Sequence, residues 1–168
     1  MVVLVDERTE HRDDVKALHR AVFGSEYEAE LVDRLDRDGL VVASLVALAG
    51  DVVVGHVLFS DLVVEIDGRP ISAASLAPLA VRPDFQGKGI GAQLVTKGLR
   101  ILRGRGRTAV IVLGHPGYYR RFGFSAALAR KVAGPFKGEN FMALELVSGA
   151  LEALVGSVRY PAAFGIEN

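Results

Sequence analysis

The chain has 168 residues, half of them hydrophobic, and Lys plus Arg balance Asp plus Glu at 20 each. This length predicts one domain, spanning residues 1–168, with a substantial buried core. A zero net charge gives no general attraction to nucleic acid or to an anionic membrane. The lack of cysteine excludes disulfides, a thiolate zinc site and a cysteine nucleophile. No apolar run approaches the roughly 18 residues of a membrane helix. We therefore expect a cytoplasmic protein with neither nucleic acid nor membrane as its partner.

The N-terminal part of the chain changes from a strand pattern to helix patterns. Val2–Val5 predicts a short strand, and apolar positions three and four apart predict an amphipathic helix over Asp13–Phe23. A second helix is expected over Glu26–Asp38, because Ser25 is a favourable N-cap and Gly39 a favourable residue to end a helix. The fold is therefore expected to begin with one strand and two helices.

The pattern becomes that of strands after Leu40. Apolar runs at Val41–Leu48 and Val52–Phe59 flank Ala49-Gly50-Asp51, which is typical of a β-hairpin, and the second run can continue to Ile66. The remaining expected elements are the strand Ser75–Val81, the helix Gly89–Arg103, the strand Ala109–Leu113, the short helix Tyr118–Phe122 and the strand Phe141–Val147. This order predicts a single-domain α/β (α+β) fold with a mixed central sheet and helices on both faces.

A glycine-rich turn joins the strand Ser75–Val81 to the helix that follows. Its glycines remove the side chains that would keep an anion away, and the amides of a helix's first turn are free to bind a pyrophosphate. A nucleoside-triphosphate loop would need Ser or Thr where Gly89 stands, and a dinucleotide fingerprint would need a different glycine spacing. The residues expected to bind are Gln86 through a polar contact, Lys88 through its charge, and Gly87, Gly89, Ile90 and Gly91 through the turn itself.

A second motif follows the strand Ala109–Leu113, where the chain reads Gly114-His115-Pro116-Gly117-Tyr118-Tyr119-Arg120-Arg121-Phe122-Gly123-Phe124. The Gln-x-x-Gly-x-Gly turn after an apolar strand resembles the acyl-coenzyme-A signature of the GNAT superfamily of N-acetyltransferases. The Tyr-x-x-Phe-Gly-Phe ending is similar to the tyrosine-bearing helix of that family. Across the whole chain, the resemblance is to a bacterial subgroup, the YhbS-like predicted acetyltransferases.

The resemblance implies an acetyltransferase that uses acetyl-coenzyme A (acetyl-CoA) as co-substrate and needs no metal. It gives Tyr119 the place of the general acid that protonates the leaving thiolate of coenzyme A, with Tyr118 as a packing neighbour. It also implies that the amide of Leu79 donates to the oxyanion and that the backbone of Val81 pairs with the pantetheine arm. Direct attack of an amine on the thioester needs these donors and a base, but no covalent intermediate.

The base is the least constrained role. Many family members use a glutamate on the strand before the turn, but Ser75–Val81 contains no carboxylate. His115 is the best-placed substitute, because it follows a central strand, is close in sequence to Tyr119 and titrates near neutrality. The alternative for His115 is a structural role, in which its ring bonds backbone carbonyls of the loop. A water chain to bulk solvent would then act as the base. Weaker candidates are Glu26, Glu30, His56 and Glu65, whereas His11 and His19 are expected at solvated or helix-surface positions.

The expected function is acetyl transfer to a primary amine of a small molecule or peptide, by a monomer or homodimer. The alternative is an acyl-CoA-binding regulatory module without turnover, to which the missing strand carboxylate gives some weight. Nucleic-acid binding through Arg103, Arg105 and Arg107 is poorly supported at zero net charge. This arginine cluster is expected to be a solvated loop, or to compete with Arg82 and Lys88 for the 3′-phosphate of coenzyme A.

Overall fold

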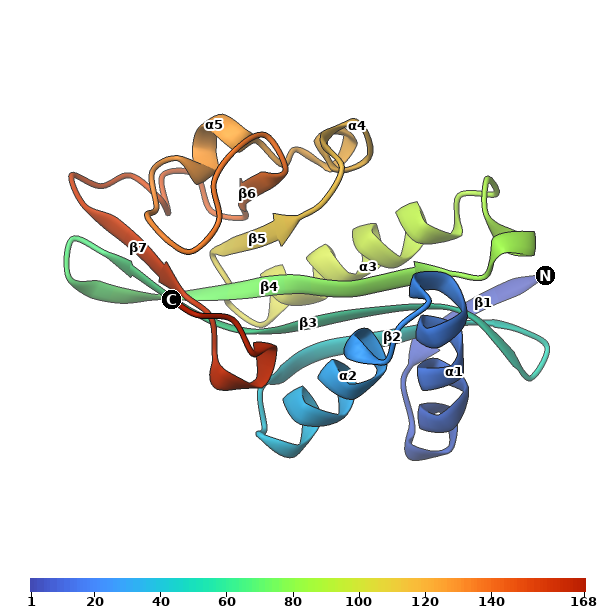
Figure 1. Cartoon of the computed structure of the whole chain (residues 1–168). Coiled ribbons are helices and arrows are strands. Elements are labelled where there is room, and N and C mark those ends of the chain that lie inside the picture. The colour runs from blue at the N-terminus through green and yellow to red at the C-terminus, as the bar shows by residue number, and fades with distance from the viewer. The chain divides into compact units, whose positions relative to one another are not determined.

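The computed structural model (Figure 1) describes residues 1–168. These residues group into two compact units. The first unit comprises Met1–Ser60 and Ala77–Ile101, and the second comprises Asp61–Leu76 and Leu102–Asn168. Three elements contribute residues to both units, namely strand β3 (Val52–Ile66), strand β4 (Arg69–Val81) and helix α3 (Ile90–Gly104). The expectation of one domain over the whole chain stays a prediction.

The first unit contains the predicted strand, two helices and hairpin at the N-terminal end of the chain. The hairpin forms because Gly50 takes a left-handed backbone conformation, with φ of 61°, between its two strands. Strand β2 pairs antiparallel with β1 on one side and with β3 on the other. The elements, besides the parts of β3, β4 and α3 in this unit, are β1 (Val2–Asp6), α1 (Arg12–Phe23), α2 (Tyr27–Arg37) and β2 (Val41–Ala49).

Helices cover both faces of the sheet in this unit, as predicted. Successive side chains of a strand point to opposite faces, and Gly55 and His56 of β3 show which helix lies on each. A Cβ placed on Gly55 would lie 3.0 Å from Leu94 of α3, whereas the His56 ring bonds His19 of α1. Helices α1 and α2 therefore pack on one face and α3 on the other, which Figure 1 also shows.

Helix α3 packs closely on β3 because a glycine replaces a larger residue at the contact. A Cβ on Gly98 would lie only 2.1 Å from Cε2 of Phe59, and both residues are buried. The phenyl ring therefore occupies the space of a missing side chain, which brings the helix backbone near the sheet.

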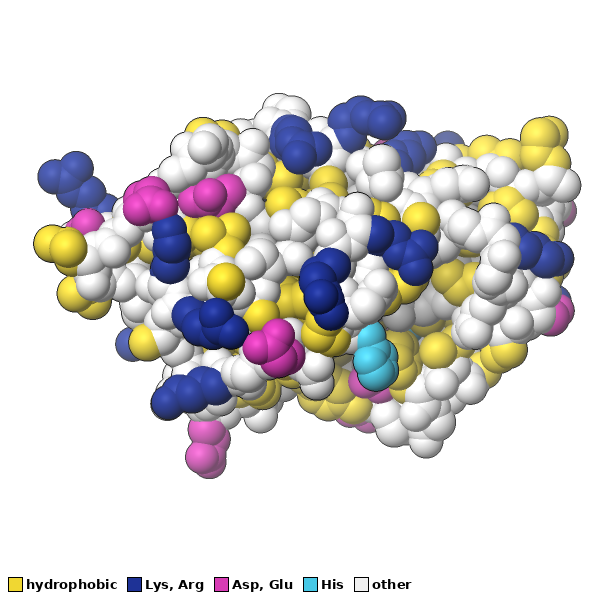
Figure 2. Space-filling view, turned by 90° about the horizontal axis from the view of Figure 1, so that it is seen from above, with side chains coloured by type: hydrophobic (Ala, Val, Ile, Leu, Met, Phe, Trp, Pro, Cys, Tyr) yellow, Lys and Arg dark blue, Asp and Glu magenta, His cyan; other side chains and the backbone are white.

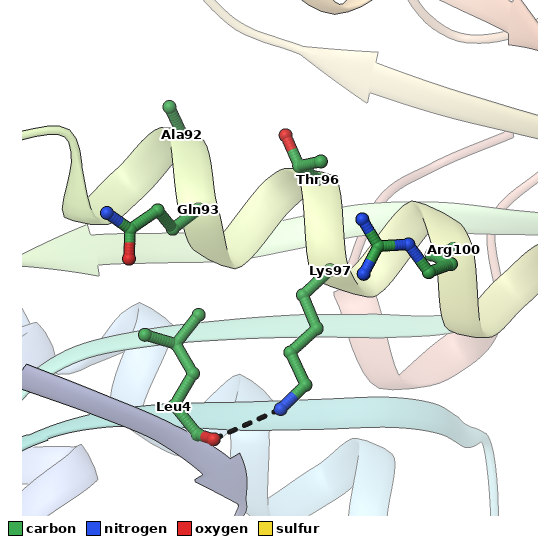
Figure 3. A pocket seen from close by; sticks show the side chains of 6 residues that line it. All are labelled: Leu4, Ala92, Gln93, Thr96, Lys97 and Arg100. Carbon is green, nitrogen blue, oxygen red and sulfur yellow. Dashed lines mark hydrogen bonds between the residues drawn. The ribbon is translucent and has the colours of Figure 1, made fainter.

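The outer strand β1 also contacts α3 through a side chain. Lys97 extends from the helix and its Nζ donates to the backbone carbonyl of Leu4 at 3.0 Å (Figure 3). The two elements border a shallow groove of about 360 Å³, which Gln93, Thr96 and Arg100 line together with Lys97 and Leu4. The contact ties the first strand of the chain to the helix that follows the glycine-rich turn.

The second unit contains the other ends of β3 and β4 and the C-terminal elements. Strand β5 pairs in parallel with β4, through Ala73 opposite Ala109, and antiparallel with β6, so the seven-stranded sheet is mixed. Strand β7 pairs antiparallel with the end of β3. The elements that this unit adds are β5 (Ala109–Leu113), α4 (Pro116–Tyr119), α5 (Ala126–Ala129), β6 (Phe141–Glu145) and β7 (Gly156–Arg159).

The predicted fold class is confirmed, with differences at single elements. Ser25 is not the N-cap of α2: Glu26 takes that position, and the Ser25 hydroxyl donates to Glu28 at 3.0 Å. Strand β4 begins at Arg69 because only Asp67 and Gly68, with φ of 52° and 78°, form the turn. The short helix begins at Pro116, and the strand β6 ends at Glu145; the elements α5 and β7 had no clear sequence pattern.

None of the helices is both long enough and apolar enough to cross a membrane.

Candidate active site

The glycine-rich turn lies in the first unit and presents free backbone amides. Gly87 and Gly89 have φ of 76° and 82°, a region that favours glycine, and a Cβ on either would have no atom within 4 Å. The amides of Gly87, Lys88 and Gly89 donate to no backbone carbonyl. They precede the first turn of α3, whose own amides are also free. Such a run of amides, at the positive end of a helix dipole, can bind an anionic ligand.

Local hydrogen bonds fix the entry to the turn. The Gln86 side chain donates from Nε2 to the carbonyl of Val81 at 2.9 Å, which closes the turn on the end of β4. Arg82 makes two hydrogen bonds of 2.6 Å to Asp84 and lies 5.1 Å from the centroid of the Phe85 ring. Gln86 and Arg82 are therefore both engaged within the chain.

Lys88 projects from the middle of the turn. Its side chain is exposed, and Nζ lies 5.0 Å from the centroid of the Phe85 ring on one side. The nearby Asp84 carboxylate is paired with Arg82, although the charge of Lys88 also acts on it. The turn therefore combines free amides with one exposed cation.

Tyr119 lies in the second unit, in the last position of α4, and its ring is held on several sides. The rings of Tyr118 and Phe124 meet it edge-on, with centroids 5.0 Å and 5.8 Å away. Burial raises the pKa of Tyr119, and the neighbouring Tyr118 raises it further, so the phenol is protonated at neutral pH. A protonated phenol can donate a proton or a hydrogen bond.

His115 directly precedes α4 and is exposed. Its backbone carbonyl accepts the amides of Tyr118 and Tyr119, each at 3.1 Å, which starts the short helix. Its ring bonds no backbone carbonyl, so the predicted alternative of a ring held by carbonyls is not what the structure contains. The ring is free to meet a ligand or solvent.

The weaker base candidates have other partners or positions. Glu26, the N-cap of α2, pairs with Arg20 at 2.7 Å, and Glu30 of α2 pairs with Arg34 at 3.3 Å; both carboxylates are exposed. Glu65 is exposed near the end of β3. His56, by contrast, is fully buried.

His56 belongs to a buried hydrogen-bond chain that the sequence did not indicate. Its Nδ1 lies 2.8 Å from Nε2 of His19, and its Nε2 lies 2.8 Å from the hydroxyl of Ser44. That hydroxyl donates to Glu7 at 2.7 Å, and Arg12 donates to the other oxygen of Glu7 at 2.7 Å. His19 is fully buried, so the prediction of a helix-surface position is wrong; its place four residues after the buried Val15 puts it on the inner face of α1.

The hydrogen positions in this chain follow from its partners. Because Ser44 gives its only hydroxyl proton to Glu7, its oxygen accepts from Nε2 of His56. Nδ1 of His56 then accepts from Nε2 of His19, and Nδ1 of His19 has no partner. Burial lowers the pKa of both histidines, to about 3 for His19, so each is neutral. Burial alone would raise the pKa of Glu7, but the His56 ring, whose Nε2 lies 3.6 Å from the carboxylate, and hydrogen bonds from Arg12 and Ser44 lower it to about 2.

The arginine cluster divides into different environments. Arg107 forms an ion pair with Asp61 and donates to the carbonyl of Ala73 at 2.9 Å, so it holds strands together. Arg103 and Arg105 are exposed. On the face seen in Figure 2, Lys and Arg side chains are scattered among hydrophobic and neutral surface and form no continuous stripe.

The predicted site residues fall into two groups. Leu79, Val81 and the residues 86–91 lie in the first unit, on the end of β4 and the turn. His115 and Tyr119 lie next to each other in the second unit. No group of three His, Cys, Asp or Glu side chains is arranged to hold a metal ion. The first unit therefore presents a turn that can bind the phosphates of a ligand, and the second unit presents a protonated tyrosine that can donate a proton.

Comparison with known proteins identifies the class. Residues 7–127 match the family model of the acetyltransferase (GNAT) domain, and the chain belongs to this family. It is 37% identical over 149 residues to YhbS of Escherichia coli K12, an uncharacterized N-acetyltransferase, which covers 87% of this chain and 88% of YhbS. The YhbS-like resemblance is thereby confirmed.

Solved structures of two relatives agree with the fold and with the co-substrate. The crystal structure of Escherichia coli YhbS in complex with CoA matches with a TM-score of 0.89 and 34% identity, covering 99% of this chain and 93% of that one. A GNAT family acetyltransferase from Brucella melitensis in complex with acetyl-CoA matches with a TM-score of 0.80 and 33% identity, covering 98% of each chain. The chain is thus an N-acetyltransferase of the family that uses acetyl-CoA as co-substrate.

Proposed function

We propose that the protein transfers the acetyl group of acetyl-CoA to a primary amine by direct attack within a ternary complex. The observation that carries this proposal is the open turn with its free amides at Gly87, Lys88 and Gly89, at the start of α3. In this proposal the amides bind the pyrophosphate of the cofactor, and Lys88 adds a positive charge. Gln86 acts indirectly, because its side-chain hydrogen bond to the carbonyl of Val81 holds the start of the turn against the end of β4.

The reaction moves one acetyl group and two protons. The amine nitrogen attacks the thioester carbonyl carbon, the carbon–sulfur bond breaks, and the amine loses a proton to a base. The amide of Leu79 stabilises the developing oxyanion, the backbone of Val81 pairs with the pantetheine arm, and Tyr119 gives its phenolic proton to the thiolate. The amine proton goes to His115 or, as we favour, through water to bulk solvent.

Release of free thiol from acetyl-CoA in the presence of a panel of amines, amino acids and peptides tests this function. We expect thiol release that depends on one class of amine and forms the N-acetylated product. Binding of acetyl-CoA without product for any amine would instead support a regulatory module. The acceptor is a small molecule or a peptide amine, and the same panel identifies it.

A charge substitution in the turn tests the cofactor assignment separately. Asn and Asp both tolerate a positive φ better than most residues, so Gly89→Asn and Gly89→Asp differ mainly in charge. We expect Gly89→Asp to lose acetyl-CoA binding in calorimetry and Gly89→Asn to keep most of it. Equal affinities in the two folded variants would contradict the assignment of the pyrophosphate to this turn.

A further inference from the structure

Strand β3 contacts the beginning of the segment that contains the turn. The amide of Arg82, the first residue after β4, donates to the carbonyl of Val54 at 2.8 Å. Because this bond joins two backbone atoms, it fixes where the chain leaves β4, whatever the Arg82 side chain does. The entry to the turn is therefore anchored on Val54.

The next residue of β3 contacts the end of the same segment. A Cβ on Gly55 would lie 3.0 Å from Cδ1 of Leu94 and 3.3 Å from Cγ2 of Ile90, the first residue of α3. On its third side it would meet the Cβ of Ala47 at 3.3 Å, which belongs to the paired strand β2 and cannot rotate away. These distances are shorter than ordinary van der Waals contacts, so a side chain at residue 55 would require the first turn of α3 to shift by a few tenths of an ångström.

The two contacts together define how the turn is held. Arg82 and Ile90 bound the turn segment at its two ends, and both are seated on adjacent residues of one strand. Next to them, His56 is fixed on the opposite face of β3 by His19 and Ser44. Strand β3 is thus held by hydrogen bonds of His56 on the face that α1 covers, and it contacts both ends of the turn segment through Val54 and Gly55.

We infer that Gly55 is a positioning residue for acetyl-CoA, which sets the place of the turn's amides by letting the first turn of α3 seat on β3. This inference rests on the proposed binding of the pyrophosphate by the turn. A side chain at position 55 would move Ile90 and Leu94 outward while Arg82 stays bonded to Val54. The amides between them would then be displaced from the positions in which they are proposed to bind the pyrophosphate.

The test is Gly55→Ala, with affinity for CoA measured by calorimetry and KM for acetyl-CoA measured with an identified acceptor. We expect Kd and KM to rise roughly tenfold while kcat changes less than about twofold, because the displaced amides contact the cofactor and not the reacting atoms. Gly104→Ala is the matched control, since a Cβ there meets no atom within 4 Å and its φ is not in the left-handed region. It should bind CoA as the unchanged protein does.

A rescue experiment separates positioning from a general loss of stability. Leu94→Val removes the methyl group nearest to the new Cβ, so Gly55→Ala with Leu94→Val should recover most of the CoA affinity. Ile90→Ala removes the contact between α3 and Gly55 from the helix side and introduces no clash. It should also weaken CoA binding, and it provides the test if Gly55→Ala does not fold.

The inference is overturned if Gly55→Ala lowers the melting temperature but binds CoA as before, or if Leu94→Val does not restore affinity. It stands apart from the cofactor assignment itself. If Gly89→Asp loses binding and Gly55→Ala does not, the pyrophosphate assignment holds and the role of Gly55 is wrong. If Gly89→Asp binds CoA normally, the underlying assignment has failed instead.

Discussion

The ring of Tyr119 lies directly against the backbone of Gly114: a Cβ on this glycine would be 2.4 Å from Cε2 of the tyrosine. Gly114 follows the last residue of β5, and its amide donates to the carbonyl of Asn140 at 2.9 Å, so its backbone is itself held in place. The tyrosine therefore rests on a fixed surface at the end of a central strand. Its orientation is set by packing and not by a hydrogen bond of its hydroxyl.

Replacing Tyr119 by Phe tests the proposed general acid. The ring contacts are kept and only the hydroxyl is lost, so CoA affinity should stay the same while kcat falls about a hundred- to ten-thousand-fold if proton donation to sulfur limits turnover. Steady-state rates over a range of pH values, with calorimetry for CoA, measure both effects. An unchanged rate at every pH would remove Tyr119 from the mechanism.

Gly114→Ala should move the tyrosine without altering its chemistry. The new methyl group would overlap the ring, which must turn away, and we expect kcat to fall roughly tenfold or more with CoA affinity retained. Gly117→Ala is the control, because a Cβ at Gly117, in the same short segment, meets no atom within 4 Å. Equal losses in the two variants would mean that the segment as a whole, and not the ring position, determines the rate.

His115→Ala distinguishes the two routes for the amine proton. We favour the water chain, so this substitution should change the rate by a small factor that is the same at all pH values. A general base would behave differently: its loss would slow the reaction mainly near neutral pH, with recovery at high pH where the amine is already deprotonated. A pH–rate profile that loses its acidic limb in His115→Ala, at unchanged CoA affinity, would assign the base to His115.

Acid should destabilise the folded protein, starting near neutral pH. The unfolded chain binds a proton at His19 below its ordinary pKa of 6.5, whereas the folded state binds it only near pH 3, so unfolding is favoured as the pH falls between these values. The expected slope is about 1.4 kcal/mol per pH unit for this one group. Glu7 acts in the same direction between 4.5 and about 2, because its carboxylate is stabilised by the fold.

Urea denaturation at a series of pH values measures this slope. His19→Gln keeps an amide that can donate to Nδ1 of His56 but does not titrate, so it should make the decline between about pH 6.5 and about pH 4.5 less steep. The part that remains comes from His56, whose pKa burial also lowers. His115→Ala, at an exposed histidine outside the buried hydrogen-bond chain, is the matched control for the loss of an imidazole. A parallel decline in His19→Gln would show that His19 is not the group responsible.

The sequence predicts well those features that depend on short-range chemistry. The extent of α3, and the turn before it, follow from apolar spacing and from glycines at 87 and 89, where the structure has positive φ. The burial of His19 depends on its partner His56, thirty-seven positions away, which no local pattern reports. Even so, its spacing of four from Val15 was a usable signal.

Gly55 is a similar case. A single glycine inside an apolar strand indicates a close approach of another backbone or side chain, but the sequence does not say which. The reason for a glycine at this position is evident only in the structure, where Ile90 and Leu94 pack against it. Likewise, β7 is defined by its pairing with β3 and not by a sequence pattern. A strand of four residues that starts with Gly156 is too short to show a recognisable alternation.

The bond between Lys97 and Leu4 has a consequence for the behaviour of the protein at high concentration. Strand β1 pairs only with β2, so its other edge carries backbone groups without a neighbouring strand. Such edges are templates for joining two molecules strand to strand, and a lysine at the edge is a common obstacle to this. The ammonium group of Lys97 donates a hydrogen bond to the Leu4 carbonyl and so places a positive charge at the edge strand. A second molecule would have to displace this charged contact before its own strand could add to the sheet, which opposes fibre-like aggregation from this side.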